Sequence, residues 1–234
     1  MDDGNILNVW GKGQLFCFSG IDGKTDFEEG LVLRSVSDIA AFEVKLPVAG
    51  GLVLLDEQPP AECCLAGDYF RLVTGQGRVV RGVMADAYHL LIEGECRILG
   101  LSEAVRLRQG RGGVLLGDRG KFCADLLNAD FEALFAERRR WLAGIKLPES
   151  LPELSRRTAA KACSMLKTQV YSPEGVLKHF WSTPDRWPHR RMWLWDSVFH
   201  AIGMRRLNPG LARDFISAVF DACQDDGFIP HMAS

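Results

Sequence analysis

Hydrophobic positions are distributed differently in the two halves of the chain. From residue 1 to about residue 127, short apolar runs such as QLFCFSG, GLVLLDE and YHLLIEG recur, and glycine or proline turn signals separate them. Strands of this length, punctuated in this way, are typical of an antiparallel sandwich or barrel. We therefore predict a β-rich N-terminal domain over 1–127. Several runs alternate only loosely between apolar and polar positions, so the pattern does not fix the number of strands.

Beyond residue 127 the apolar positions take a helical spacing. NADFEALFAERRRWLAG predicts a helix with one apolar stripe, and KLPESLPEL, with its two prolines, predicts a linker, so we assign 128–150 to a linker helix and a linker. Two further helices are expected at about 152–170 and from about Asp196 to Arg205. The second half is therefore helical, and the fold class is α+β.

The clearest helix signal lies near the end of the chain. Asn208 is a good N-cap and Pro209 suits the first helical position. Leu211, Phe215 and Val219 then recur at i, i+4 and i+8, which predicts one buried stripe. The next strong stop signal is the glycine at position 227.

The segment WSTPDRWPHRRMWLWDSVFH holds four of the six tryptophans of the chain. Flat aromatic faces suit the C–H faces of sugar rings, although core packing is the better interpretation for any single tryptophan. Four of them mixed with Arg186, Arg190 and Arg191 are hard to bury, because guanidinium groups stay mostly exposed or paired. The segment therefore predicts a pocket wall of aromatic and cationic side chains.

Asp196 has two interpretations within this segment. It can cap the helix that follows, which stabilises a helix by about 1 kcal/mol. It can also be a catalytic acid, because a carboxyl group packed beside Trp195 and shielded from water retains its proton more readily. The local spacing alone favours the cap.

Composition excludes several classes of function. The 234 residues are 47% hydrophobic and 25% charged, with a formal net charge of −2, so nothing draws the chain towards nucleic acid or an anionic membrane. Seven cysteines without a C-x-x-C pattern indicate reduced thiols, no metal site and a cytoplasmic location. No apolar signal core, membrane span or nucleotide-binding glycine pattern is present, so we expect no export, no membrane and no cofactor.

TPDRWPHRRMWLWDSVFHAIGM, followed by DDGFIPHM, resembles the glycoside hydrolases of family 63 and the related mannosylglycerate hydrolases. The resemblance joins Trp-Asp and Phe-His at fixed offsets to a downstream Asp-Gly-Phe-Ile-Pro-His, and it covers about residues 171–232. It implies that 151–234 is the start of an (α/α)6 barrel, a six-hairpin glycosidase fold. The β-rich half corresponds, by architecture alone, to the extra β-domain that precedes such barrels.

The resemblance also implies roles for individual residues. Asp196 would protonate the leaving oxygen in hydrolysis that inverts an α-linkage. Helix packing and substrate contact explain His200 equally well, and the core and a sugar subsite explain Trp187 equally well. For His189 and Arg191, a position in a surface loop is the better interpretation. The residues implied to shape the sugar subsite are Trp193, Trp195, Arg190, His200, Trp187 and His231.

The substrate stays open within the enzyme interpretation. A trehalose-like disaccharide, a glucosyl- or mannosyl-glycerate and an oligosaccharide end are all compatible α-linked glucosides or mannosides. Arg186, Arg190 and Arg191 would favour a carboxylate on the aglycone. The same arginines could instead bridge loops by pairing with Asp185 or Asp214.

The second carboxylate of an inverting glycosidase lies far downstream in the family, and twelve helices complete the barrel. We therefore expect a truncated, N-terminal part of a longer enzyme, inactive alone, with the general base beyond the chain end. Leu211, Phe215 and Val219 could then not all be buried, and exposed barrel helices would promote self-association.

Two alternatives remain. One is a non-catalytic carbohydrate-binding or regulatory fragment that uses the β-domain and the tryptophan-rich loop. The other is a different hydrolase that uses acid pairs among Asp185, Asp196, Asp225 and Asp226, although the last two read as the polar end of a helix.

Overall fold

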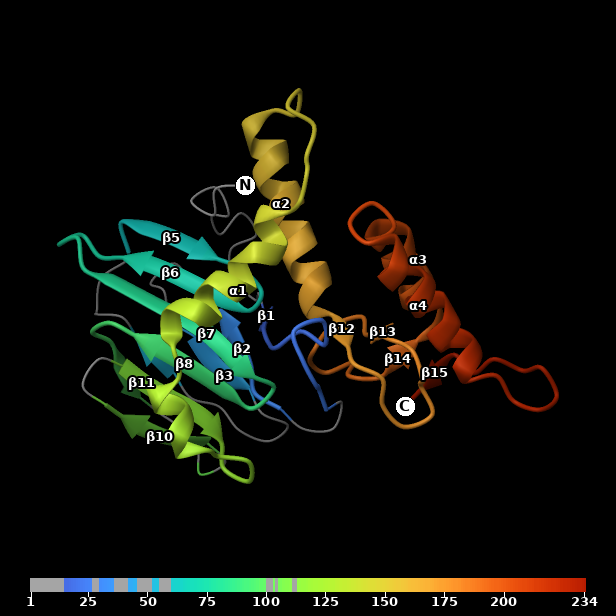
Figure 1. Cartoon of the computed structure of the whole chain (residues 1–234), viewed down its shortest axis with the longest axis horizontal. Helices are drawn as coiled ribbons and strands as arrows, with labels where there is room; N and C mark the ends of the chain where they lie inside the picture. Colours follow the sequence, from blue (N-terminus) through green and yellow to red (C-terminus); the bar gives the residue numbers. More distant parts are fainter. Residues whose placement is uncertain are drawn as a thin grey trace.

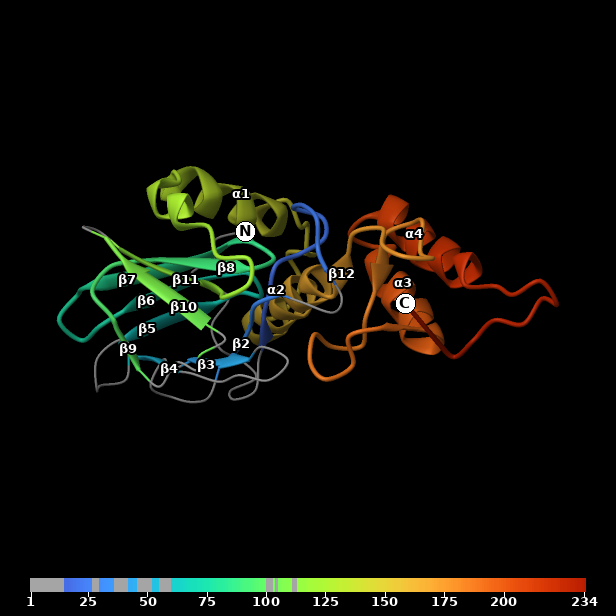
Figure 2. The same ribbon diagram turned by 90° about the horizontal axis from the view of Figure 1, so that it is seen from below.

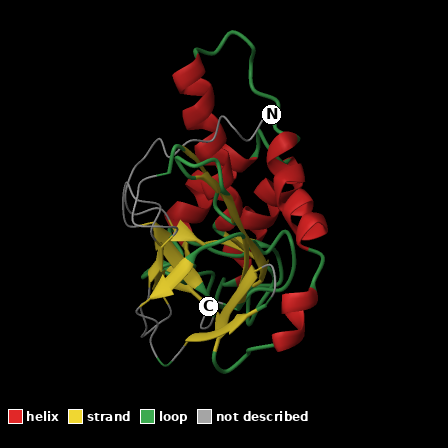
Figure 3. Ribbon diagram, turned by 90° about the vertical axis from the view of Figure 1, so that its left-hand side faces the viewer, coloured by secondary structure: helices red, strands yellow, loops and turns green. Residues whose placement is uncertain are grey.

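The computed structural model describes residues 15–26, 30–35, 42–45, 52–54, 60–99, 103, 105–110 and 113–234. These residues form antiparallel sheets and four α-helices, which confirms the predicted α+β class. The two larger sheets occupy one end of the molecule and the last two helices the other end (Figure 1). The helices are grouped beside the strands (Figure 3).

The larger sheet is six-stranded and antiparallel throughout, in the order β10-β11-β8-β7-β6-β5. Its strands are β5 (Glu62–Leu65), β6 (Tyr69–Val73), β7 (Val79–Asp86), β8 (His89–Glu93), β10 (Val105–Gln109) and β11 (Gly113–Asp118). The second sheet is five-stranded, in the order β1-β2-β3-β4-β9. Its strands are β1 (Leu15–Phe16), β2 (Val32–Ser35), β3 (Phe42–Lys45), β4 (Leu52–Leu54) and β9 (Arg97–Leu99).

The six-stranded sheet is covered on both faces. Leu90 and Ile92 of β8 belong to a core shared with Phe16 and Leu33 of the five-stranded sheet. Leu91, which points the other way because side chains alternate along a strand, packs with residues of the first helix. Figure 2 shows these layers stacked. Strands buried on both faces are apolar at successive positions, which explains the loose alternation in the sequence.

Helix α1 (Phe131–Ala143) lies across the outer face of this sheet (Figure 2). Asp130 caps it by accepting a hydrogen bond from the Ala133 amide at 3.0 Å. The Phe135 ring meets Tyr69 of β6 edge-on, with ring centroids 5.3 Å apart. The segment predicted as a linker helix is therefore packed on the sheet.

Helix α2 (Glu153–Thr168) joins the two ends of the molecule, close to the range predicted for it. Its buried Lys167 ammonium lies 2.8 Å from Asp22 Oδ2 and 2.5 Å from Asp68 Oδ2. Asp22 comes from the N-terminal segment and Asp68 from the turn between β5 and β6. Because a buried charge is costly unless it is paired, this cluster fixes the place of α2 against the β-rich part.

The helical end contains α3 (Leu194–Met204) and α4 (Pro209–Asp221), which pack against each other. Asn208 caps α4 as predicted, accepting hydrogen bonds from the amides of residues 210 and 211 at 3.0 and 3.1 Å. The helix ends at Asp221, well before Gly227. Gly227 instead has a φ of +85° within a turn that follows the helix.

Short two-stranded ladders connect the loops of this end. They pair β12 (Val170–Tyr171) with β13 (Trp181–Ser182) and β14 (Met192–Trp193) with β15 (Met232–Ala233). Among the described residues no helix is long and apolar enough to cross a membrane. All seven cysteines lie in the described ranges and are free thiols.

The predicted exposure of the α4 stripe is wrong. Leu211, Phe215 and Val219 are 7%, 0% and 5% exposed. Leu211 and Phe215 pack against Ala201 and Met204 of α3, and Val219 belongs to a cluster with Trp181 and other loop residues. The exposed apolar stripe lies on α3 instead, at Trp195, Val198, Phe199 and Ile202.

Candidate active site at the start of helix α3

The start of α3 is held by the last residues of the chain. In the ladder of β14 with β15, Met192 is opposite Ala233 and Trp193 is opposite Met232. One residue on, the Leu194 amide donates a hydrogen bond to the His231 carbonyl at 2.9 Å. The two segments that carry the family resemblance therefore lie side by side, although α4 separates them in sequence (Figure 1).

An aromatic cluster of His189, Trp193, Trp195 and His231 lies at this ladder. The His231 ring meets Trp193 and Trp195 edge-on, with ring centroids 5.0 and 5.6 Å apart. His189 meets Trp193 in the same way at 5.6 Å. Trp193 is half-buried, whereas Trp195 is 61% exposed. Three of the predicted subsite residues thus come together, and one of them presents most of its indole to solvent.

Asp196 does not occupy the N-cap position of the helix. The N-cap is Trp193, which makes no capping hydrogen bond with its side chain, and Asp196 lies inside the first turn. An anion there still interacts favourably with the helix dipole. The side chain is half-buried, and its carboxylate makes no hydrogen bond or ion pair with the described part of the chain. The cap interpretation is therefore wrong, and the carboxylate is left available.

His200 lies one helical turn after Asp196, on the same side of α3. Its Nδ1 is 3.1 Å from the Ser182 hydroxyl of β13. Burial lowers the pKa of His200, and the Asp196 carboxylate opposes that effect only in part. The imidazole is therefore neutral at pH 7 and places no positive charge beside Asp196. The role of Ser182 has no signal in the sequence, because the ladder of β12 with β13 brings it here.

Trp187 and Arg190 form a second group in the loop before α3. The Arg190 guanidinium lies over the Trp187 ring, 6.0 Å from its centroid. Arg190 also lines a small cavity with Tyr171 and Arg186. These two residues therefore contact each other and the base of the loop, and their part in a sugar subsite stays a prediction.

Arg186 is a structural residue, which corrects its predicted part in binding a substrate carboxylate. It is 4% exposed, and the Cζ atom of its guanidinium group lies over the Tyr171 ring, 3.7 Å from the ring centroid. It donates hydrogen bonds to the carbonyls of Thr168 at 2.5 Å, Val170 at 3.2 Å and Phe18. All of these contacts join the loop to α2, β12 and the N-terminal segment, so Nε and Nη2 are engaged inside the protein.

Three other acids at this end are engaged in local structure. Asp185 pairs with His189, with 2.9 Å between Oδ2 and Nδ1. Asp221 accepts hydrogen bonds from the backbone amides of residues 178 and 179, and Asp226 accepts one from the Phe228 amide. Burial by itself would raise the pKa of Asp221, but the hydrogen bonds from His179 and the backbone outweigh burial and lower it. No group of three or more His, Cys, Asp or Glu in the described ranges could hold a metal ion.

Residues 188–234 match the family model of the mannosylglycerate hydrolase MGH1-like glycoside hydrolase domain. The match includes the loop before α3, both last helices and the strand β15. It therefore confirms the resemblance seen in the sequence for this segment, which contains Asp196 and all four residues of the aromatic cluster. This end of the chain is similar to a glycoside hydrolase domain.

Proposed function

We propose that the chain is the N-terminal part of an inverting α-glycosidase with Asp196 as its general acid. The bond hydrolysed is the O-glycosidic bond of an α-linked glucoside or mannoside. The observation that carries the proposal is an available, half-buried carboxylate beside an exposed indole, within the segment similar to a glycoside hydrolase domain. Helices α2 to α4 would be the first part of an (α/α)6 barrel, and the β-rich end a sandwich-like domain.

The surroundings of Asp196 suit a proton donor. A neighbouring cation would favour the charged carboxylate. His200, one helical turn from Asp196, has a pKa lowered by burial and is neutral at pH 7. No hydrogen bond from the described residues holds the carboxylate in its charged form either. The donor role therefore requires no rearrangement of existing ion pairs.

Trp195 is the residue best placed to bind a sugar ring. Its indole is 61% exposed and immediately precedes the acid in the helix. The edge of His231 rests against it, and His231 is itself fixed by its carbonyl contact with Leu194 and its ring contact with Trp193. A flat aromatic face held in this way suits the C–H face of a pyranose.

An inverting mechanism also needs a general base roughly 6.5–9.5 Å from the acid. Asp185, Asp221 and Asp226 are held by the contacts given above, so they are poor candidates for activating a water molecule. The proposal assigns the base to a residue outside 1–234. The substrate remains a trehalose-like disaccharide, a glycosylglycerate or an oligosaccharide, and the burial of Arg186 removes one argument for a carboxylate-bearing aglycone.

The proposal is tested by binding and hydrolysis of α-glucosides and α-mannosides. Calorimetry should show weak binding that Trp195→Ala reduces and Asp196→Asn preserves. Phe199→Ala is the matched control, because Phe199 is a similarly exposed aromatic residue on the same helix. Absence of binding to every sugar would reject the subsite. Hydrolysis by the purified chain, abolished by Asp196→Asn, would reject the position assigned to the base.

The same measurements distinguish the glycosidase proposal from the alternative of a non-catalytic carbohydrate-binding or regulatory fragment. Tight binding that is unaffected by Trp195→Ala and located in the β-rich end would favour that alternative. Weak binding at Trp195 favours the glycosidase proposal.

A further inference from the structure

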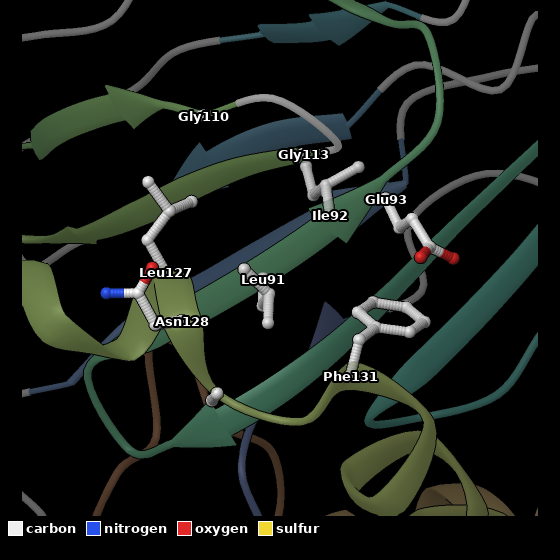
Figure 4. A pocket seen from close by; sticks show the side chains of 9 residues that line it. Leu91, Ile92, Glu93, Gly110, Gly113, Leu127, Asn128 and Phe131 are labelled. Atoms are coloured by element: carbon white, nitrogen blue, oxygen red, sulfur yellow. The ribbon is translucent and has the colours of Figure 1, made fainter.

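A cavity of about 370 Å³ lies on the outer face of the six-stranded sheet. It is bordered by β8 and β11 on one side and by the 3-10 helix η2 (Ala124–Asn128) and the start of α1 on the other. Figure 4 shows Leu91 between Leu127 and Phe131, with Asn128 and Glu93 on opposite sides. Its volume falls at the lower end of the range of small-molecule pockets, roughly 300–1,000 Å³.

The apolar wall of this cavity is held in place. Leu91 is 4% exposed and belongs to the core beneath α1. The Phe131 ring stacks on Phe135, with centroids 5.6 Å apart, and the Arg81 guanidinium lies 5.0 Å from its centroid. A preformed apolar wall reduces the ordering cost of binding.

Two glycines at the rim keep the cavity open. A Cβ atom at Gly110 would lie 2.9 Å from the Leu127 side chain, and one at Gly113 would lie 2.3 Å from the Ile92 carbonyl oxygen. Any larger residue at Gly110 would push Leu127 aside or enter the space between them. The open volume beside Leu127 therefore depends on the absence of a side chain at Gly110.

Polar groups at the two sides are available to a ligand. The Arg81 guanidinium pairs with Oε2 of Glu93, and Oε1 makes no hydrogen bond within the described part of the chain. The side-chain amide of Asn128 is exposed and is likewise without a hydrogen bond to any described residue. A ligand would thus meet an acceptor on one side and a group that donates and accepts on the other.

The charged groups beside Glu93 disfavour an anionic ligand. The Arg81 guanidinium pairs with both Glu93 and Glu132. These three groups have a net charge of −1, so an anion at the Glu93 side of the cavity would be repelled. A neutral ring with hydroxyl groups on its edge and C–H groups on its face fits all three features. Its C–H face would contact the apolar wall, its hydroxyl groups would meet the polar sides, and its lack of charge would avoid repulsion.

We propose that this cavity binds a single neutral sugar unit of pyranose size. Its hydroxyl groups would reach Glu93 and Asn128, and its C–H face would lie against Leu91 and Leu127. The site is separate from the aromatic cluster and does not depend on Asp196. It would give the β-rich end a carbohydrate-binding function of its own.

The test is a titration of the ¹⁵N-labelled chain with methyl α-glucoside and methyl α-mannoside, followed by NMR. Saturable shifts are expected at the amides of residues 113, 128 and 129, with affinity in the millimolar range. Ala129→Trp, which fills the cavity, should abolish them. Asn128→Ala changes only an exposed side chain and should weaken binding about tenfold, the effect of losing one hydrogen bond.

Two matched controls locate the effect. Asp125→Ala, on the same 3-10 helix but outside the cavity lining, should leave the affinity unchanged, and so should Trp195→Ala. Absence of saturable shifts, or shifts that persist in both cavity variants, would overturn the proposal. Equal affinity for glucuronate would overturn the charge argument. Failure at this site leaves the glycosidase proposal intact, because that proposal is read out at Trp195.

Discussion

The imidazole of His231 lies edge-on against the indole of Trp193, with ring centroids 5.0 Å apart. This contact joins the last residues of the chain to the residue that precedes α3. The backbone pairing of β14 with β15 fixes its register. The position of Asp196 in the first turn of α3 therefore depends on a segment that follows α4 in sequence.

Replacing Asp196 with Asn should lower the pKa of His200. Burial already lowers it, and the negative charge of Asp196 opposes that effect, so loss of the charge leaves burial unopposed. The measurement is an NMR titration of the His200 ring. Asp214→Asn, on α4, is the control and should leave the titration unchanged. An unaltered His200 titration in Asp196→Asn would contradict the electrostatic interaction between the two side chains.

Lys161 should make stability depend on pH. It is fully buried, and burial lowers its pKa from 10.5 to about 7. The unfolded chain therefore binds more protons than the folded chain between pH 7 and 10.5, so the free energy of unfolding should rise with pH in that window. The slope is at most about 1.4 kcal/mol per pH unit.

The Lys161→Met variant should lose this slope and be more stable than the wild type at pH 7. The comparison is best made by urea unfolding between pH 7 and 8.5. Above that range the half-buried thiols of Cys63 and Cys96, whose pKa values partial burial raises to about 11, contribute a slope of opposite sign. Lys146→Met, at an exposed position, is the control. Equal slopes in wild type and Lys161→Met would show that Lys161 is not the titrating group.

Arg186 should be essential for the stability of the helical end. Arg186→Met would remove the guanidinium hydrogen bonds to the carbonyls of Thr168, Val170 and Phe18 and the cation over Tyr171. The Phe18 carbonyl would lose its donor, whereas Val170 would keep its hydrogen bond from the Gly20 amide. We expect a loss of about 3 kcal/mol or more in the free energy of unfolding, because an orphaned buried acceptor costs about 1–3 kcal/mol. Denaturant unfolding measures this, with the exposed Arg205→Met as control. A loss no larger than that of the control would contradict the structural role.

The exposed stripe on α3 should cause the isolated chain to associate with a second copy. Trp195, Val198, Phe199 and Ile202 recur at helical spacing and are 37–69% exposed, which is an apolar surface of the kind that promotes association. Phe199→Asp with Ile202→Asp should shift the sedimentation of the chain towards monomer. Leu154→Asp, at a 67% exposed position on α2, is the matched control. Association that survives the double variant would place the interface elsewhere.

Local signals in the sequence predicted local structure well. The Asn208-Pro209 start of α4 is confirmed, because capping involves only atoms within one turn. The loose alternation of the N-terminal strands did not reveal that a helix and a second sheet cover opposite faces of the six-stranded sheet. Central strands such as β8 carry apolar side chains on both faces, and the identity of the covering layers is a property of the whole fold.

The candidate site shows the same division. The tryptophans, the acid and the Asp-Gly-Phe-Ile-Pro-His segment are visible in the sequence, and so is their similarity to a glycoside hydrolase domain. The sequence could not show that Arg186 is buried, because an arginine is buried only where carbonyls from distant segments converge. It also misplaced the exposed stripe, because either face of the α3–α4 pair could have been the outer one.

The sequence by itself determined the α+β class, the start of the last helix and the similarity of the last segment to a glycoside hydrolase domain, because these depend on composition and on neighbours along the chain. The tertiary structure decided which of those residues meet. Backbone pairing of β14 with β15 brings His231 to Trp193 and Trp195, and the packing of α4 on α3 buries Phe215 while leaving Phe199 exposed. These outcomes depend on contacts between segments far apart in sequence, which no local pattern specifies.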